Sequence, residues 1–279
     1  MLWYIVDMNK IKRLLLVKSK YLAIGFGLLV LILILWFFVY KEKEETIKGY
    51  QFLIAIDKSW APLDLHGQEQ YMQGFISELI AKIAKEEEIK IQLVTVPSSQ
   101  LFDNLEKGFY EGVISPLSPN VINEKKYIFS EPVYFVGPVL IVPLHSKATK
   151  ISELHNVGVK TGFSGIFTIS GSPMTQILTY NDMNMALNDL ARGKIDGLIM
   201  GSVDAYANIQ GYYRDKLKVV TSPLTNEGLR LVTLNNFFGQ ELEKHFDKGL
   251  LQTKKEGYYQ NLLKKWELVD PEKAYLPPM

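Results

Sequence analysis

One long apolar segment constrains this chain more than any other feature of its sequence. Residues 21–40 read YLAIGFGLLVLILILWFFVY and contain no charged side chain. A helix rises about 1.5 Å per residue, so the segment would span roughly 30 Å, the thickness of the hydrocarbon core of a bilayer. A soluble helix of this length is rarely apolar on all sides. The sequence therefore predicts one transmembrane helix over 21–40.

The charges beside this segment predict its orientation. Five basic residues precede it within 1–20, whereas the three lysines of 41–49 are diluted by three glutamates. Because cytoplasmic flanks carry the excess of Lys and Arg, we expect 1–20 to be a cytoplasmic basic segment and 41–49 a juxtamembrane linker. The protein is then a single-pass protein of the cytoplasmic (inner) membrane, with its C-terminal domain extracytoplasmic, in the periplasm.

A cleaved signal peptide is the competing interpretation of the same segment. Signal peptides have a shorter apolar core, of roughly 7–15 residues, and end in small residues. This segment instead ends in WFFVY, without a small residue. We therefore expect an uncleaved signal anchor.

The remainder of the chain alternates short apolar runs with amphipathic segments. Residues 52–56 and 112–114 are typical of buried strands, whereas 75–84 place their apolar side chains on one face of a helix. Such alternation predicts a mostly parallel α/β sheet covered by helices. A second series of the same kind begins with the strand expected at 157–159. The chain is therefore expected to contain two α/β lobes.

Composition and motifs exclude several functional classes. The chain has no cysteine, which excludes disulfides, thiol catalysis and a lipidated cysteine, and its net charge of +1 indicates no nucleic-acid partner. The four histidines have no partner three or four residues away, so no metal site is predicted. No nucleophile elbow, phosphate-binding loop or metalloprotease motif is present. We therefore expect a protein that is not an enzyme and that needs no cofactor.

Seven stretches occur in the order and spacing of a known family. They read IAIDKSWAPL (54–63), MQGFISEL (72–79), LEKGFYEGVI (105–114), YIFSEPVY (127–134), VGVKTGFS (157–164), LARGKIDGL (190–198) and KEGYYQNLLKKW (255–266). Together they make the chain resemble the family 3 extracellular solute-binding proteins. That family has the type II periplasmic-binding-protein fold and serves ABC transporters of polar amino acids.

The resemblance implies two lobes joined by two hinge crossovers. Lobe 1 is expected to comprise 50–137 and 224–279, and lobe 2 to comprise 138–223. A ligand that contacts both lobes favours the closed state by its differential affinity. The implied function is a membrane-anchored solute-binding protein that captures a small polar ligand for an ABC importer, with the ABC permease as its partner. The alternatives are a sensory or regulatory module acting on a membrane signalling partner, and a degenerate binding protein retained for a protein contact.

The resemblance also assigns residues to the ligand site. Trp60 holds the position of the ring that stacks on the ligand, and Asp57 lies in the loop that reads the ligand's side chain. The expected polar lining consists of Ser115, Ser118, Asn123 and Ser164. Each has a structural alternative, since the ring can fill the core and the polar side chains can stabilise turns.

Two charged anchors of the family's amino-acid binders are absent. An Arg six residues before the phenylalanine of the FS pair is replaced by Asn123, and an Asp five residues after Asp196 is replaced by Gly201. Burying a zwitterion without these counter-charges is unfavourable, so we expect weak binding of common α-amino acids. If another position supplies a compensating cation, Arg192, Arg214 and Arg230 are the places to look, and the sequence favours none of them.

Overall fold

The computed structural model describes residues 28–37, 49–163 and 175–273, and the chain divides into two units, 1–50 and 51–279. In the first unit, residues 28–37 are helical and exposed. No helix among the described residues combines the length and apolarity that a membrane span needs. The rest of the predicted span, 21–27 and 38–40, lies outside the described residues. The transmembrane anchor therefore stays a prediction.

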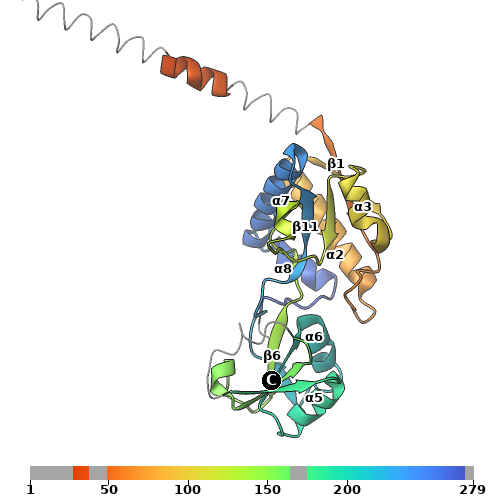
Figure 1. The fold of residues 1–279 in the computed structure, drawn as a ribbon, viewed down its shortest axis with the longest axis vertical. Helices are drawn as coiled ribbons and strands as arrows, with labels where there is room; N and C mark the ends of the chain where they lie inside the picture. The colour runs from red at the N-terminus through yellow and green to blue at the C-terminus, as the bar shows by residue number, and fades with distance from the viewer. Residues whose placement is uncertain (1–27, 38–48, 164–174, 274–279) are drawn as a thin grey trace, which may run out of the picture. The chain divides into compact units, whose positions relative to one another are not determined.

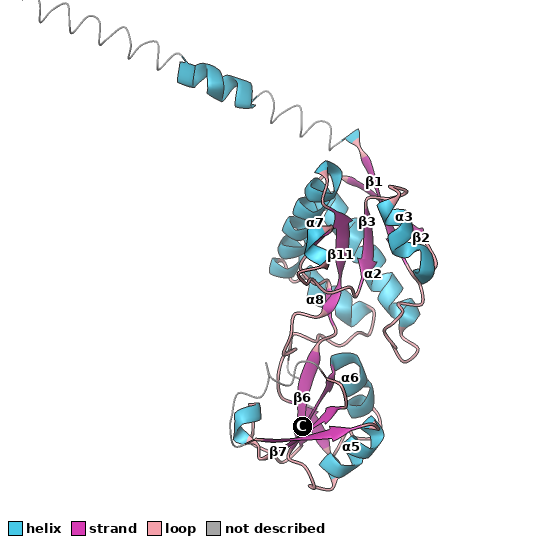
Figure 2. Cartoon of the chain, viewed as in Figure 1, coloured by secondary structure: helices cyan, strands magenta, loops and turns pink. Residues whose placement is uncertain are grey.

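The second unit contains two sheets (Figures 1 and 2). The strands of the first sheet are β1 (Gln51–Ile56), β2 (Lys90–Thr95), β3 (Gly112–Ser115), β4 (Tyr127–Phe129), β5 (Tyr134–Phe135) and β11 (Gly228–Leu234). Their order is β2-β1-β3-β11-β4, and β5 also pairs with β11. β1 runs parallel to β2 and β3, whereas β11 runs antiparallel to β3, β4 and β5.

Helices cover both faces of this sheet. They are α2 (Glu69–Glu86), α3 (Leu101–Glu106), α7 (Phe237–Lys255) and α8 (Tyr258–Lys265), with short 3-10 turns η1 (Ser98–Gln100) and η2 (Asn123–Lys125). α3 and α7 lie on opposite sides of the sheet (Figure 1). α7 begins where Asn236 Oδ1 accepts a hydrogen bond from Gly239 N at 2.9 Å. Only glycine fits at Gly239, because a Cβ there would lie 2.0 Å from the carbonyl oxygen of Leu234.

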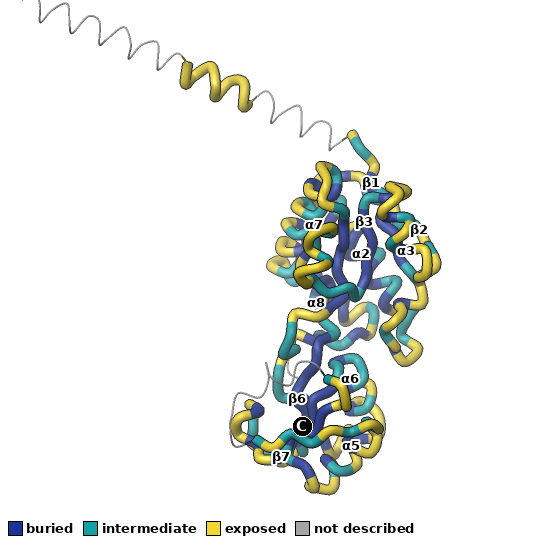
Figure 3. Tube along the Cα trace, in the orientation of Figure 1, coloured by how far each residue is buried: buried dark blue, intermediate teal, exposed yellow. Residues whose placement is uncertain are grey.

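The second sheet is built from a continuous stretch of chain. Its strands are β6 (Pro138–Pro143), β7 (Asn156–Lys160), β8 (Gln176–Tyr180), β9 (Gly197–Gly201) and β10 (Leu217–Val219), in the order β10-β6-β9-β7-β8. The segment between β6 and β7 holds the 3-10 turn η3 (Ile151–Glu153). Helices α5 (Met183–Ala191) and α6 (Ser202–Gln210) contribute to a core with Val139 and Ile141, while Leu140 and Val142 enter a second core. β6 is therefore buried on both faces, as its dark colour in Figure 3 shows.

Within the described residues of the second unit, the chain crosses between the sheets twice. The first crossing is 136–137, between β5 and β6, and the second is 220–227, between β10 and β11. The two are hydrogen-bonded to each other, because Val136 N and Gly137 N both donate to the carbonyl oxygen of Glu227, at 3.0 and 3.1 Å. We call the first sheet with its helices the first lobe, and the second sheet with its helices the second lobe. The predicted two-lobed α/β arrangement is thus confirmed, whereas the exact limits 50–137 with 224–279 and 138–223 stay predictions.

The sheets are mostly parallel, as expected, because all described strands of each sheet but one run in the same direction. The reversed strand is β11 in the first sheet and β6 in the second. β6 is antiparallel to β9 and β10, and β11 is antiparallel to all its partners. β6 and β11 are the strands that directly follow the crossings. Each starts at the edge nearest the other lobe and runs away from it, whereas β1, β3, β7 and β9 run toward that edge. The reversed strands are therefore a consequence of the crossings.

Candidate functional site

A cavity of about 420 Å³ lies in the first lobe beside the two crossings. Its walls come from the segments that follow β1 and β3, from α3, and from one residue of each crossing, Val136 and Glu227. The carboxyl ends of β1 and β3 therefore meet at this cavity, and this is where α/β sheets generally bind ligands. We call it the crossing cavity.

Two of the predicted site residues line the crossing cavity. Ser115, at the end of β3, is buried, and its Oγ accepts a hydrogen bond from Leu117 N at 3.1 Å. Ser118 also lines the cavity, and its carbonyl oxygen accepts a hydrogen bond from Asn123 Nδ2 at 3.1 Å. The structure thus brings these two residues to one cavity, although their contact with a ligand stays a prediction.

Glu227 is the charged residue of the site that sequence reasoning missed. Among the described residues that line the crossing cavity, it alone has a titratable side chain. It lies at the end of the second crossing, where the sequence SPLTNEG has neither helical nor strand periodicity. The one sequence feature that could have indicated Glu227 is its position as a lone carboxylate directly before β11, the first strand after the second crossing.

Trp60 does not line the crossing cavity, so its contact with a ligand stays a prediction. Its side chain is only 2% exposed, and Nε1 donates to the carbonyl oxygen of Glu69 at 3.1 Å. The indole nitrogen therefore has a polar partner, and the ring packs as part of the core. The residues that directly follow it, Ala61, Pro62 and Leu63, line the cavity instead.

The other predicted site residues have structural partners or lie outside the description. Asp57 accepts hydrogen bonds from Ser59, through N at 3.1 Å and through Oγ at 2.6 Å, so it stabilises the turn after β1. Asn123 bonds to Ser118 and does not itself line the cavity. Ser164 lies outside the described residues, so its predicted role is untested.

The space beside Gly201 is bounded by another carboxylate. A Cβ at Gly201 would lie 3.8 Å from Asp204 Oδ2, and Asp204 Oδ1 lies 2.7 Å from Nε2 of His66. His66 belongs to the segment before α2 in the first lobe, whereas Asp204 lies in α6 of the second lobe. This contact therefore links the two lobes outside the crossings.

Arg230 is the buried cation closest in register to the cavity. It lies opposite Ser115 in the β3–β11 pairing and is 2% exposed. Nη1 donates to Ser130 O at 3.2 Å, Nη2 donates to Asn226 O, and Nε has no partner among the described atoms. Burial lowers the pKa of the Arg230 guanidinium. The charges of Glu131 and Asp247 act in the other direction and raise it, but they do not cancel the effect of burial. Arg230 lines a separate cavity of about 410 Å³ and joins the second crossing to the segment after β4.

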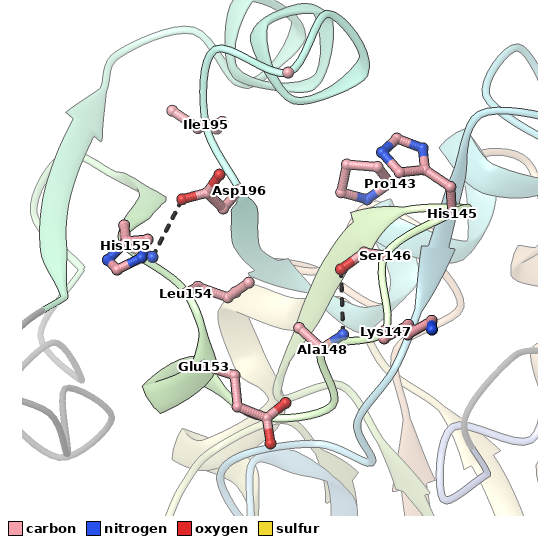
Figure 4. Close-up of a pocket in the computed structure, with 11 residues that line it drawn as sticks. Pro143, His145, Ser146, Lys147, Ala148, Glu153, Leu154, His155, Ile195 and Asp196 are labelled. Carbon is pink, nitrogen blue, oxygen red and sulfur yellow. Dashed lines mark hydrogen bonds between the residues drawn. The ribbon is translucent and has the colours of Figure 1, made fainter.

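A larger cavity of about 580 Å³ lies at the end of the second sheet opposite the crossings, where β6 ends and β7 begins (Figure 4). Asp196 lines this cavity, and its carboxylate accepts a hydrogen bond from His155 N at 3.1 Å (Figure 4). In the described part of the chain, no three His, Cys, Asp or Glu side chains are grouped so that they could hold a metal ion. This cavity contacts neither crossing, so it lies away from the segments that would move in a hinge.

Comparison with known proteins gives a consistent result. The model of the bacterial extracellular solute-binding proteins, family 3, matches residues 52–269. A probable histidine-binding protein of Neisseria gonorrhoeae is 24% identical over 195 residues, which cover 68% of each chain. A putative ABC transporter arginine-binding protein 2 of Escherichia coli K12 is 26% identical over 252 residues, which cover 85% of this chain and 97% of the relative.

Two solved structures share the fold. The second substrate-binding domain of a putative amino acid ABC transporter from Streptococcus pneumoniae has a TM-score of 0.59 and 26% identity, and covers 77% of this chain and 99% of that domain. The L-cystine solute receptor of Neisseria gonorrhoeae, in its unliganded open conformation, has a TM-score of 0.60 and 16% identity. It covers 80% of this chain and 94% of the receptor.

Proposed function

The chain belongs to the bacterial extracellular solute-binding proteins of family 3, and from this premise we propose that it captures a small polar ligand between its lobes and delivers it to an ABC importer. Proteins of this family are substrate-binding components of transport systems and catalyse no reaction. The ligand is expected at the crossing cavity.

The position of the crossing cavity carries the proposal. Val136 and Glu227 belong to the two segments that connect the lobes, and both line the cavity. A ligand bound there touches the backbone segments that a hinge motion would bend. Its binding therefore has a different free energy in the open and closed states, which is the condition for a ligand to drive closure.

The apolar segment 21–40 gives the proposal its location. We propose that it holds the binding domain at the outer face of the cytoplasmic membrane, so that the protein meets its permease without diffusing. Cell fractionation and sequencing of the mature N-terminus test this location. A soluble protein that begins between residues 40 and 50 would contradict it.

Ligand binding and lobe closure are measured on the full chain kept in mild detergent. Thermal unfolding is screened with amino acids, amines, sugars, nucleosides and organic acids, and a specific ligand raises the Tm by mass action. Because the chain has no cysteine, Lys107→Cys and Asp215→Cys place one spin label on an exposed site of each lobe. We expect the ligand to change the distance between the labels. No stabilising compound, or binding without a distance change, would contradict the proposal.

A further inference from the structure

We propose that the ligand of the crossing cavity is an organic amine whose ammonium group pairs with Glu227 and which carries no carboxylate. This inference rests on the proposed function, because it names the ligand class of the same site. It depends on three observations: the charge of the cavity lining, the hydrogen bonds that Arg230 already makes, and the apolar and hydroxyl side chains around the cavity.

The Glu227 carboxylate is available to a ligand. It lines the crossing cavity and is exposed, and within the described part of the chain no hydrogen bond or ion pair holds it. Its backbone is nevertheless fixed, because its carbonyl oxygen accepts from both Val136 N and Gly137 N. A carboxylate on a fixed backbone and without a protein partner is suited to an ammonium group, through charge-assisted hydrogen bonds.

No cation of the described lining is placed to pair with a ligand carboxylate. The described residues around the crossing cavity include no Lys, Arg or His. The sequence of 164–174, SGIFTISGSPM, also contains none, so that segment cannot supply one. A ligand carboxylate entering the cavity would therefore lose its hydration and meet the charge of Glu227, which is unfavourable.

Arg230 does not change this balance. Two of its guanidinium nitrogens donate to the carbonyl oxygens of Ser130 and Asn226, and the side chain lines a different cavity. The negative charges of Glu131 and Asp247 also favour the charged form of the Arg230 guanidinium. Binding a ligand carboxylate at Arg230 would require breaking backbone contacts that hold the second crossing in place.

The walls fit the body of an amine better than that of a small ion. The side chains of Pro62, Leu63, Phe102 and Leu117 give the cavity apolar walls, and Ser115 and Ser118 add hydroxyl groups. A volume of about 420 Å³ lies within the usual range of small-molecule sites. An apolar body with one cationic end and hydrogen-bonding groups matches this lining.

Matched pairs of compounds test the inference. Each pair consists of an amino acid and the amine left when its α-carboxylate is removed: arginine and agmatine, lysine and cadaverine, histidine and histamine. Titration calorimetry is performed on the full chain in detergent. We expect at least one amine to bind about tenfold or more tightly than its parent amino acid, and Glu227→Gln to weaken that amine about tenfold or more.

The matched control is Glu124→Gln, which removes an exposed carboxylate of the same lobe that lines the other cavity. It should leave amine affinity unchanged, and Glu227→Ala should repeat the loss caused by Glu227→Gln. An amino acid that binds as tightly as its amine, or equal losses from Glu227→Gln and Glu124→Gln, would overturn the inference. A neutral or acidic ligand that closes the lobes would overturn it while sustaining the proposed function. A chain that binds nothing in the wider screen would overturn both.

Discussion

Nε2 of His66 lies 2.7 Å from Oδ1 of Asp204, and this contact joins the segment before α2 in the first lobe to α6 in the second. The two side chains are 39% and 50% exposed. They belong to different lobes and are 138 positions apart in the sequence. The contact therefore constrains the lobes independently of the two crossings.

Removing this contact should have a small and measurable effect. The variants His66→Ala, Asp204→Ala and their combination form a double-mutant cycle on the free energy of urea unfolding. Because both side chains are partly solvated, we expect a coupling of about 0.2–1 kcal/mol that decreases with added salt. A coupling of zero at low salt would show that the pair does not hold the lobes together.

Replacing Trp60 should destabilise the ligand-free chain. The residue is 2% exposed and its Nε1 donates to the partly buried carbonyl oxygen of Glu69, so Trp60→Ala leaves a large cavity and an unpaired acceptor. We expect a loss of about 3–5 kcal/mol in urea unfolding, and a smaller loss for Trp60→Phe. Phe109→Ala, at a side chain that is 64% exposed, is the control and should change little. Normal stability with abolished ligand binding in Trp60→Ala would instead assign the ring to the ligand.

Asp247 should make stability fall as the pH rises. Burial is the main cause that raises the pKa of Asp247 from 3.8 to about 7, with the charges of Glu243 and Glu131 adding to it. The folded state therefore holds a proton that the unfolded state releases above about pH 4. Stability is lost between about pH 4 and pH 7, by an amount on the order of 2 kcal/mol for this partly solvated group.

Asp247→Asn tests this pH dependence. The amide oxygen can still accept from Glu131 N, which donates to Asp247 at 3.0 Å. We expect the variant to be more stable than the native chain at pH 8 and to show a flatter profile of unfolding free energy between pH 4 and 8. Asp215→Asn, at an exposed site of the second lobe, should leave the profile unchanged. A variant that is less stable at pH 8 would show that the Asp247 charge is stabilising, through Arg230.

Restoring the two absent anchors should create binding of α-amino acids. Gly201 has room for a side chain, since the nearest atoms lie 3.8 Å from its expected Cβ. Asn123→Arg supplies a guanidinium that can form two hydrogen bonds to a ligand carboxylate. Gly201→Asp supplies a carboxylate that can pair with a ligand ammonium group. We expect the double variant to bind at least one α-amino acid about tenfold more tightly than the native chain, by calorimetry. Asn123→Gln with Gly201→Ala is the uncharged control, and equal affinities in the two double variants would refute the placement of the anchors.

The sequence predicted those parts of the fold that local patterns determine. The strand expected at 52–56 lies within β1, and the helical face expected at 75–84 lies within α2. The direction of β11 was not predictable in this way. Its apolar run shows only that it is buried, whereas its antiparallel pairing follows from the crossing that precedes it. Strand direction in a sheet depends on where the chain enters, and local periodicity carries no such information.

The site was predictable only where a motif marked it. Ser115 ends β3 and Ser118 lies three residues beyond it, so the carboxyl end of the strand places them at the cavity. The burial of Trp60 was not predictable, because an aromatic residue in a loop gives no sign of whether its ring points inward or toward a ligand. Glu227 was missed because a residue in an irregular crossing acquires its neighbours only when two distant parts of the chain meet.

The place of β11 between β3 and β4 sets an order of events during biosynthesis. The five described strands of the second sheet lie within 138–219, whereas β3 must wait for a partner whose Leu231 pairs with Ile114 across more than a hundred residues. A chain leaves the ribosome amino end first, so the second lobe has its full set of strands earlier. Until residue 234 emerges, β3 has an unpaired edge of the kind that invites aggregation. The half-built first sheet is thus the part of the nascent chain that chaperones have most reason to shield.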